Sequence, residues 1–205
     1  MIEVEKKLDL TPAEEARLLK GATFVNEKTF TDIYYDTADY VLTREDIWLR
    51  EREGKWELKV SRDRSLNRLG DQYEEVTDSA EILARLSLDR VLKLNRALLA
   101  THGYRPFVEL ATTRRKYKKG AYTIDCDLVR YAGTDMVYRL AEIEAQATDD
   151  AHREEVLADL LFFLKKEGIA IRHVRGKITA YMFAHRLEHA KALVAAGVYR
   201  KEEQN

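Results

Sequence analysis

IEVEKKLDL, residues 2–10, contains the pattern from which the fold can be worked out. Successive side chains of a β-strand point to opposite sides. Glu3, Glu5 and Lys7 therefore share one face of this strand, and the mostly apolar residues between them share the other. For a single strand, the ordinary interpretation is an apolar face in the core and a charged face in water. Whether that interpretation holds depends on how often the pattern recurs.

The pattern recurs along the chain, and the charged faces are sorted by sign. The acidic pairs are Glu3/Glu5, Asp125/Asp127 and Glu142/Glu144, and the basic residues on such faces are Arg50, Arg52, Lys59 and Arg115. Trp48 alternates with Arg50 and Arg52 and shares their face, and Glu75 lies on a further charged face. Like charges two residues apart repel one another, so opposite charges must compensate them unless every face is in water.

A closed barrel would bring these charged faces together. Its outer face can be apolar and covered by helices, while its interior holds a ligand. Gathered carboxylates suit a hard divalent cation, Mg²⁺ or alternatively Mn²⁺. Gathered arginines and lysines suit phosphate oxygens, which arginine can bind with two parallel hydrogen bonds. The charged faces together therefore predict a metal-assisted phosphoryl site inside a tunnel.

The remaining sequence is consistent with an α+β fold, an antiparallel sheet with helices packed outside it. Strands are predicted over residues 1–9, 29–36, 45–53, 55–61, 71–77, 106–119, 121–131 and 137–147. Helices are predicted from the capping sequence Thr11-Pro12-Ala13-Glu14 to near Gly21, over 79–102 with a break near Leu88, over 150–167 and over 177–196. Glu53-Gly54 and Lys119-Gly120 are expected to form tight hairpin turns. No linker interrupts residues 1–205, so we expect one domain.

Composition sets limits on where the protein works and what it binds. The net charge of -1 creates no general attraction for nucleic acid or anionic membranes. Cys126 is the single cysteine, which excludes an internal disulfide and suits a reducing compartment. Charge begins at Glu3 with no apolar signal segment after it, and no apolar run approaches the length of a membrane span. We therefore expect a cytoplasmic protein.

Several motifs, taken in order, resemble the CYTH superfamily of triphosphate tunnel metalloenzymes. EVEKK fits its E-x-E-x-K signature, and YYDTADYVLTREDIWLRERE, WELK, QYEEV, TRRKY, IDCD, AEIEA and GKITAYM follow in the same order. The YYDT, WLR-R-E and WELK stretches are most similar to the branch of thiamine triphosphatases. The resemblance implies an eight-stranded antiparallel β-barrel forming a tunnel, with a triphosphate on basic residues and Mg²⁺ among carboxylates.

The resemblance also implies roles for individual residues. It assigns Glu3, Glu5 and Lys7 to catalysis, and the metal to Glu3, Glu5, Asp125, Asp127, Glu142 and Glu144. It assigns substrate binding to Lys7, Trp48, Arg50, Arg52, Lys59, Glu75, Arg115, Glu142 and Lys177. One Mg²⁺ is expected at Asp125, Glu142 and Glu144, and a second near Glu3 and Glu5. Arg115 is preferred to Arg114 both by motif alignment and by its expected inward face.

The function that this resemblance implies is Mg²⁺-dependent hydrolysis of thiamine triphosphate to the diphosphate and phosphate. Three alternatives remain: an inorganic tripolyphosphatase, an adenylate cyclase, or a protein that binds polyphosphate or a nucleotide without turning it over. The expected partner is a small triphosphate, with no nucleic acid and no membrane, and the chain is expected to be a monomer.

Other conspicuous residues receive a structural interpretation. His185 and His189 lie one helical turn apart but lack a third ligand, so we expect a solvated helix face. Cys126 alternates with Asp125 and Asp127 and should therefore point away from the tunnel as an inert buried thiol. Asp36 is expected to hold the turn that follows it.

Overall fold

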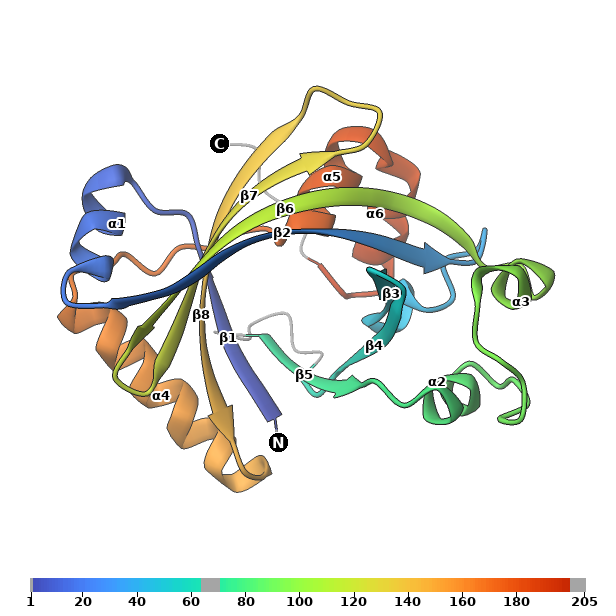
Figure 1. Cartoon of the computed structure of the whole chain (residues 1–205), viewed down its shortest axis with the longest axis horizontal. Helices are drawn as coiled ribbons and strands as arrows, with labels where there is room; N and C mark the ends of the chain where they lie inside the picture. Colours follow the sequence, from blue (N-terminus) through green and yellow to red (C-terminus); the bar gives the residue numbers. More distant parts are fainter. Residues whose placement is uncertain (1, 64–70, 200–205) are drawn as a thin grey trace.

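The computed structural model describes residues 2–63 and 71–199. Its centre is an antiparallel sheet of eight strands that closes into a ring in the order β1-β5-β4-β3-β2-β6-β7-β8 (Figure 1). The strands are β1 (Ile2–Leu8), β2 (Thr23–Asp36), β3 (Ile47–Arg52), β4 (Lys55–Ser61), β5 (Asp71–Val76), β6 (Arg105–Lys119), β7 (Tyr122–Tyr131) and β8 (Val137–Ala147). The predicted closed antiparallel sheet is confirmed.

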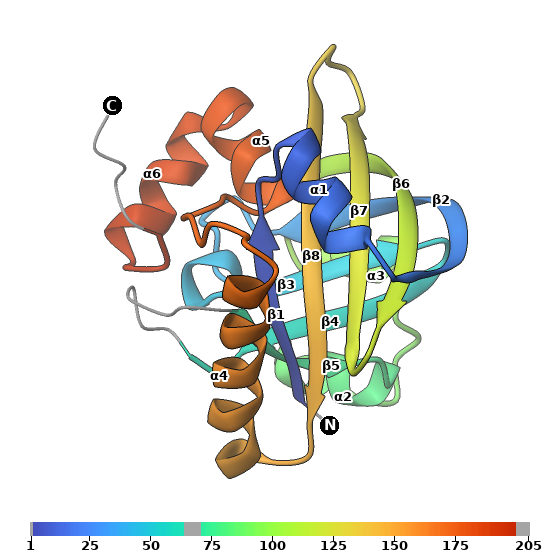
Figure 2. The same ribbon diagram turned by 90° about the vertical axis from the view of Figure 1, so that its left-hand side faces the viewer.

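The helices lie outside this ring, as predicted. They are α1 (Pro12–Leu19), α2 (Ser79–Arg85), α3 (Arg96–Thr101), α4 (Asp150–Lys166), α5 (Lys177–His185) and α6 (Leu187–Ala195), with a 3₁₀ turn, η1, at Thr43–Glu45. Figure 1 shows α1 and α4 at one end of the ring and α2 and α3 at the other. Turned by 90°, α4 lies alongside β1 and β8 (Figure 2).

The apolar core lies between the outer face of the sheet and these helices. Val4, Ile124 and Ile143 are fully buried on the outer faces of β1, β7 and β8, where they pack with Leu160 and Leu164 of α4. Burying the apolar residues outside the ring leaves the alternate, charged residues to face inward.

Cys126 belongs to the outer apolar layer. It lies in the cluster that α4 covers, and burial raises the pKa of its thiol to about 12. The expected inert thiol that points away from the tunnel is therefore what the structure contains.

Local sequence signals determine several boundaries. Thr11 caps α1, and Glu14 bonds back to its backbone N–H, which completes the predicted capping box. The two hairpin turns lie where predicted, with left-handed backbone at Glu53, Gly54 and Gly120. Glycine adopts that conformation at low cost, which suits it to two-residue hairpin loops.

Three predicted boundaries differ from the structure. β2 begins at Thr23 rather than residue 29, because its first residues pair with the C-terminal end of β6. The break predicted near Leu88 in the helix over 79–102 is confirmed, but it extends over residues 86–95 and leaves two short helices. Ser87 has a left-handed φ of 59°, which ends the first, and Asn95 caps the second. The helix predicted over 177–196 breaks at Arg186.

The break at Arg186 places His189 in the interior, and the predicted solvated face is wrong for this residue. His189 is 2% exposed, is stacked on Tyr40 and bonds to Thr43 Oγ1 at 2.7 Å. The single hydroxyl proton of Thr43 is donated to Asp36 at 2.6 Å. The hydroxyl oxygen therefore accepts from Nε2–H of a neutral His189.

Asp36 holds the turn after β2, as predicted. Its two carboxylate oxygens accept from the backbone N–H groups of Thr37, Leu42 and Thr43. The Asp36–Thr43–His189 chain of hydrogen bonds therefore fastens η1 to α6.

His189 should make folding stability depend on pH. Burial lowers the pKa of His189 to about 4, so below its ordinary value of 6.5 the unfolded chain binds a proton that the folded chain does not. Stability is therefore expected to fall as the pH drops from 6.5 towards 4, by about 2 kcal/mol between pH 7 and pH 5. His189→Gln keeps a donor for Thr43 and does not titrate. Urea unfolding of both proteins should show the difference, and identical pH dependence would contradict it.

Across the described residues, 2–63 and 71–199, no helix has the length and apolar character needed to cross a membrane.

Candidate active site

The register of the closed sheet directs the charged residues to its inner side. Residues directly opposite each other on antiparallel strands have side chains on the same face. Glu5 of β1 lies opposite Glu144 of β8, and Lys7 lies opposite Glu142. Glu142 in turn lies opposite Asp125 of β7. The charged inner face is therefore continuous across β1, β8 and β7.

These side chains surround a cavity of about 290 Å³ inside the ring. Eleven of the residues predicted for the site line it: Glu3, Glu5, Lys7, Trp48, Arg50, Arg52, Lys59, Glu75, Glu142, Glu144 and Lys177. The other lining residues are Tyr34, Glu57, Tyr73, Arg114, Lys116, Gly176, Ile178, Thr179 and Tyr199. The sequence did not lead us to predict this second group as part of the lining. The strand register would have placed its strand residues on the inner face.

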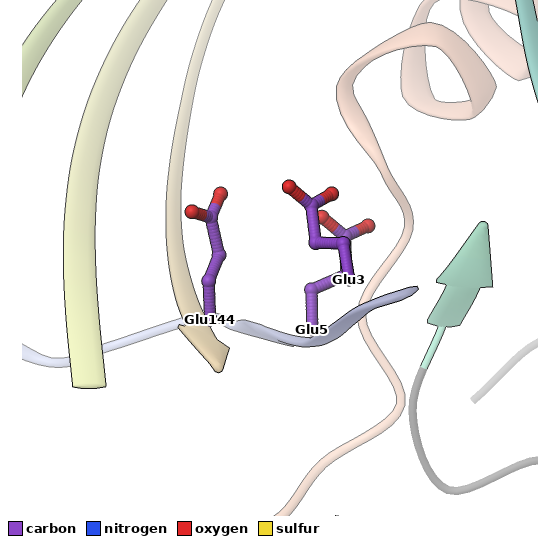
Figure 3. A group of neighbouring side chains, drawn as sticks. All are labelled: Glu3, Glu5 and Glu144. Carbon is purple, nitrogen blue, oxygen red and sulfur yellow. The ribbon is translucent and has the colours of Figure 1, made fainter. Parts of the chain in front are cut away.

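Three carboxylates form a cluster on one wall of the cavity. One oxygen from each of Glu3, Glu5 and Glu144 lies within 4.8 Å of the others. Figure 3 shows their carboxylates pointing to the same side of β1 and β8. Lys59 contacts Glu3 at 3.2 Å and Lys7 contacts Glu5. Within the described part of the chain, the Glu144 carboxylate makes neither a hydrogen bond nor an ion pair with another side chain.

The electrostatics of this cluster fit a divalent cation. Burial, followed by the charges of Glu3, Asp125 and Glu142, raises the pKa of Glu144 to about 8. Burial also raises the pKa of Glu3, against the effect of Lys59. Carboxylates that resist ionisation together can all ionise around a bound cation, and oxygen donors are the ligands that Mg²⁺ and Mn²⁺ prefer. Glu3, Glu5 and Glu144 could therefore hold such an ion.

Asp125, Asp127 and Glu142 are the other carboxylates of the predicted metal set. Asp125 and Asp127 are 0% and 4% exposed, and cationic side chains cover them. Lys116 contacts Asp125 at 2.9 Å and Lys177 contacts Asp127 at 3.0 Å. In this structure Asp125 and Glu142 therefore pair with cations, and the metal set of Asp125, Glu142 and Glu144 stays a prediction. The nearest compensating charges of these buried carboxylates are ammonium and guanidinium groups.

Glu142 is held ionised by the same cations. Burial on its own would raise the pKa of Glu142, but the charges of Lys177 and Arg114 hold it below its usual range. One oxygen of Asp125, Oδ1, is buried without a hydrogen-bond partner among the described residues. Asp125 thus keeps one unused acceptor.

Arg114 faces the cavity, and the predicted inward orientation of Arg115 is wrong. The guanidinium of Arg114 bonds to Asp125, to Asp127 and, at 2.7 Å, to Glu142. Arg115 lies on the outer face and contacts Glu15 of α1 at 2.8 Å. The β6–β7 register explains the exchange, because it sets Arg115 opposite the outward Cys126. Counting pairs back from the Lys119-Gly120 turn would have shown this from the sequence.

The other cations line the opposite wall. Arg52 binds both oxygens of Asp32, at 2.6 and 2.9 Å, and lies over the Phe30 ring. Arg50 is 7% exposed and pairs with Glu57 at 2.6 Å. The Arg50 Nε atom is buried without a hydrogen-bond partner in the described part of the molecule. A buried guanidinium with an unused donor is suited to an incoming oxyanion.

Lys59 links the two walls. It contacts Glu3 at 3.2 Å and Glu75 at 2.7 Å. Burial alone would lower the pKa of Lys59, but Glu3 and Glu5 raise it above its ordinary range. Lys59 is therefore a permanent positive charge between the carboxylate cluster and Arg50.

The start of α5 closes one side of the cavity, and tyrosine side chains position it. Tyr131 donates to the Lys177 carbonyl at 2.6 Å and Tyr138 donates to the Arg175 carbonyl at 2.7 Å. Gly176 caps the helix beside Lys7, and a Cβ atom there would lie 3.1 Å from Lys7 Cε. A larger residue at this position would require the Lys7 side chain to shift by a few tenths of an ångström.

Aromatic side chains form one part of the lining, which we name the aromatic mouth: Tyr34, Trp48, Tyr73 and Tyr199. Trp48 is 6% exposed, and its indole meets the Tyr199 ring edge-on with centroids 6.5 Å apart. Lys59 lies opposite Trp48 in the β3–β4 register, so the aromatic mouth adjoins the cationic wall. An aromatic surface beside phosphate-binding cations can accept a planar group attached to a phosphate chain.

Comparison with known proteins agrees with this architecture. The chain is 28% identical over 218 residues to the thiamine-triphosphatase of Homo sapiens, covering 100% of this chain and 94% of that protein. The thiamine-triphosphatase of Macaca fascicularis gives the same identity and coverage.

Solved structures share the fold at lower identity. The PH1819 protein from Pyrococcus horikoshii OT3 is 20% identical with a TM-score of 0.59, over 89% of this chain and 99% of that one. A Hippeastrum protein, HpAC1, described as having a dominant triphosphatase activity, is 17% identical with a TM-score of 0.50, over 89% and 95% of the two chains. The sequence matches the CYTH domain over residues 1–171. This chain therefore belongs to the CYTH family.

Proposed function

We propose that the protein is a phosphoanhydride hydrolase that converts thiamine triphosphate to thiamine diphosphate and phosphate with Mg²⁺. The observation that carries the proposal is the pairing, inside one cavity, of a three-carboxylate cluster with a wall of buried cations. The similarity to thiamine triphosphatases over the whole chain supports the reaction and the substrate.

The cations of the tunnel would hold the phosphate chain. Arg50 is buried, Lys59 and Arg114 are partly buried, and all three are permanently charged. They can therefore neutralise phosphate oxygens without first losing many waters. Arg52 and Lys7 are paired with Asp32 and Glu5 and could exchange these partners for phosphate. Holding the chain in one line supplies the positioning on which phosphoryl transfer depends.

The carboxylate cluster would lie beside the bond that breaks. Glu3, Glu5 and Glu144 would hold the cation and orient a water towards the terminal phosphorus. A bound divalent cation supplies positive charge to phosphate oxygens and lowers the pKa of a bound water. No residue of the chain needs to form a covalent intermediate, because charge stabilisation and orientation account for most of this chemistry.

The basic run of β6 is not a surface for nucleic acid in this proposal. Arg114 and Lys116 face the cavity, Arg115 pairs with Glu15, and Lys119 pairs with Glu167 at 2.9 Å. Four of the five cations in residues 114–119 thus face the cavity or pair within the molecule, and Lys118 bonds the Thr123 hydroxyl on the surface. This distribution supports a small-molecule substrate.

Phosphate release from thiamine triphosphate, tripolyphosphate and ATP tests the proposal. We expect the highest kcat/KM with thiamine triphosphate, and complete loss of release when EDTA removes the metal. Highest activity on tripolyphosphate would make the protein an inorganic tripolyphosphatase. Cyclic AMP formation from ATP would make it a cyclase, and binding without turnover of any of the three would leave a binding protein.

Trp48→Ala tests which group is attached to the phosphates. Thiamine carries a pyrimidine and a positively charged thiazolium, and an indole offers a stacking surface to the first and a favourable face to the second. We expect kcat/KM for thiamine triphosphate to fall by about ten- to thirtyfold, and tripolyphosphate hydrolysis to change little. Equal losses on both substrates would mean that Trp48 only supports the sheet.

A further inference from the structure

Asp46 lies behind the aromatic mouth and connects its two main residues. Its side chain is fully buried, and one oxygen, Oδ1, accepts from Trp48 Nε1 at 2.8 Å and from the Tyr73 hydroxyl at 3.1 Å. Trp48 belongs to β3 and Tyr73 to β5, and β4 lies between these strands in the sheet. A single carboxylate oxygen therefore joins two aromatic rings from strands that do not pair.

The backbone of Asp46 is fixed as firmly as its side chain. It adopts a left-handed conformation, with φ 54°, between η1 and β3. Its carbonyl accepts from Ser61 N at the end of β4, at 3.2 Å, and its N–H donates to the Thr43 carbonyl at 3.1 Å. Aspartate and asparagine tolerate this conformation better than most residues with a side chain. Asp46 is thus tied to β3, β4 and β5 together.

The segment before Asp46 is fixed by hydrogen bonds to β2 and α6. Thr43, whose carbonyl accepts from Asp46 N, also forms the hydrogen-bond chain with Asp36 and His189. The position of the Asp46 carboxylate is therefore set by β2 and α6 as well as by the strands it contacts. A polar group that is held by several hydrogen bonds restricts the movement of the side chains bonded to it.

We propose that Asp46 is a positioning residue that sets the orientation of Trp48 and Tyr73 for the organic group of the substrate. The inference rests on the proposed function, because it requires a substrate with a ring to place against the aromatic mouth. A buried indole N–H and a buried phenol each need an acceptor, and a shared acceptor fixes the orientation of the two rings relative to each other. These hydrogen bonds of Asp46 reach the two rings and the neighbouring backbone. Lys59 lies 5.9 Å from the centroid of the Tyr73 ring, so we expect the larger effect on binding of the organic ring and a smaller one on binding of the phosphates.

Two substitutions separate this role from general stability. Asp46→Gly removes the carboxylate and keeps the left-handed backbone accessible. Asp46→Asn keeps an oxygen that can accept from both rings and tolerates the same backbone conformation. We expect Asp46→Gly to lower kcat/KM for thiamine triphosphate about tenfold, mainly through KM, with a change within about twofold on tripolyphosphate. Asp46→Asn should restore the ratio of the two efficiencies to near the wild-type value.

A fluorescence measurement reports the orientation without requiring turnover. The chain has two tryptophans, Trp48 and Trp56, so a Trp56→Phe background leaves Trp48 as the single reporter. Asp46→Gly in this background should increase quenching of Trp48 by acrylamide, and Asp46→Asn should not. Unchanged quenching in Asp46→Gly, or equal activity losses on both substrates, would overturn the inference. Wild-type protein that fails to hydrolyse thiamine triphosphate would refute the proposed function instead, and the quenching result would still decide the role of Asp46.

Discussion

Glu5→Gln is expected to reduce kcat for phosphate release by at least about a thousandfold at saturating Mg²⁺. Glu5 is 5% exposed and supplies one of the three clustered carboxylates. Glutamine keeps the size of the side chain but cannot supply the negative charge that binds the cation. Steady-state phosphate release across a range of Mg²⁺ concentrations measures the loss.

The same variant has an expected effect on stability that checks the fold. Removing one of the three clustered carboxylates relieves repulsion on Glu3 and Glu144, but it also removes the ion pair between Glu5 and Lys7. These opposing effects should leave the Tm of the metal-free variant close to that of the wild type. Mg²⁺ and tripolyphosphate together should raise the Tm of the wild type by mass action and leave the variant nearly unchanged. Glu155→Gln, an exposed change on α4, serves as the matched control. A Glu5→Gln enzyme as active as this control would contradict the metal site.

Arg114→Ala should lower kcat/KM by about a hundredfold on every triphosphate tested, because it removes a cation from the phosphate path. It also leaves Asp125, Asp127 and Glu142 with fewer compensating charges. Removing one partner from such a buried network is expected to cost about 3 kcal/mol of folding stability. Urea unfolding and phosphate release, measured on the same preparation, separate the two effects.

The neighbouring residue provides the matched control. Arg115→Ala removes the same side chain from the outer face, where its contact with Glu15 is well exposed. Exposed ion pairs contribute about 0–1 kcal/mol, so stability should change little and activity should stay within about twofold. If Arg115→Ala were the inactive variant and Arg114→Ala the active one, the orientation of β6 described above would be refuted.

The alternation of charged and apolar residues predicted a tunnel with a charged interior, and the resemblance to the CYTH superfamily implied its eight antiparallel strands. A tunnel with an apolar outside requires every strand to have one charged face, and β1, β3, β7 and β8 each show it within a few residues. Residues with strong local preferences also determined boundaries, such as the capping box at Thr11 and the turn at Glu53-Gly54. These features depend on interactions within a few residues, which the sequence displays directly.

The errors lie where side chains compete for distant partners. Arg114 and Arg115 are adjacent basic residues with the same local preferences, and the pairing of β6 with β7 determines which of them faces inward. His185 and His189 share a helical pattern, yet the break at Arg186 and the contacts with Tyr40 and Thr43 bury only His189.

The sequence by itself determined which residues are charged, that they alternate on strands, and that carboxylates and cations would meet in one tunnel. The tertiary structure decided which carboxylates lie near one another: Glu3 and Glu5 meet Glu144 across the β1–β8 pair. Asp125, Asp127 and Glu142 meet Arg114, Lys116 and Lys177 instead. The physical reason is that alternation follows from the strand's own geometry, whereas the charge that compensates a buried carboxylate depends on register and on helices placed by the whole fold.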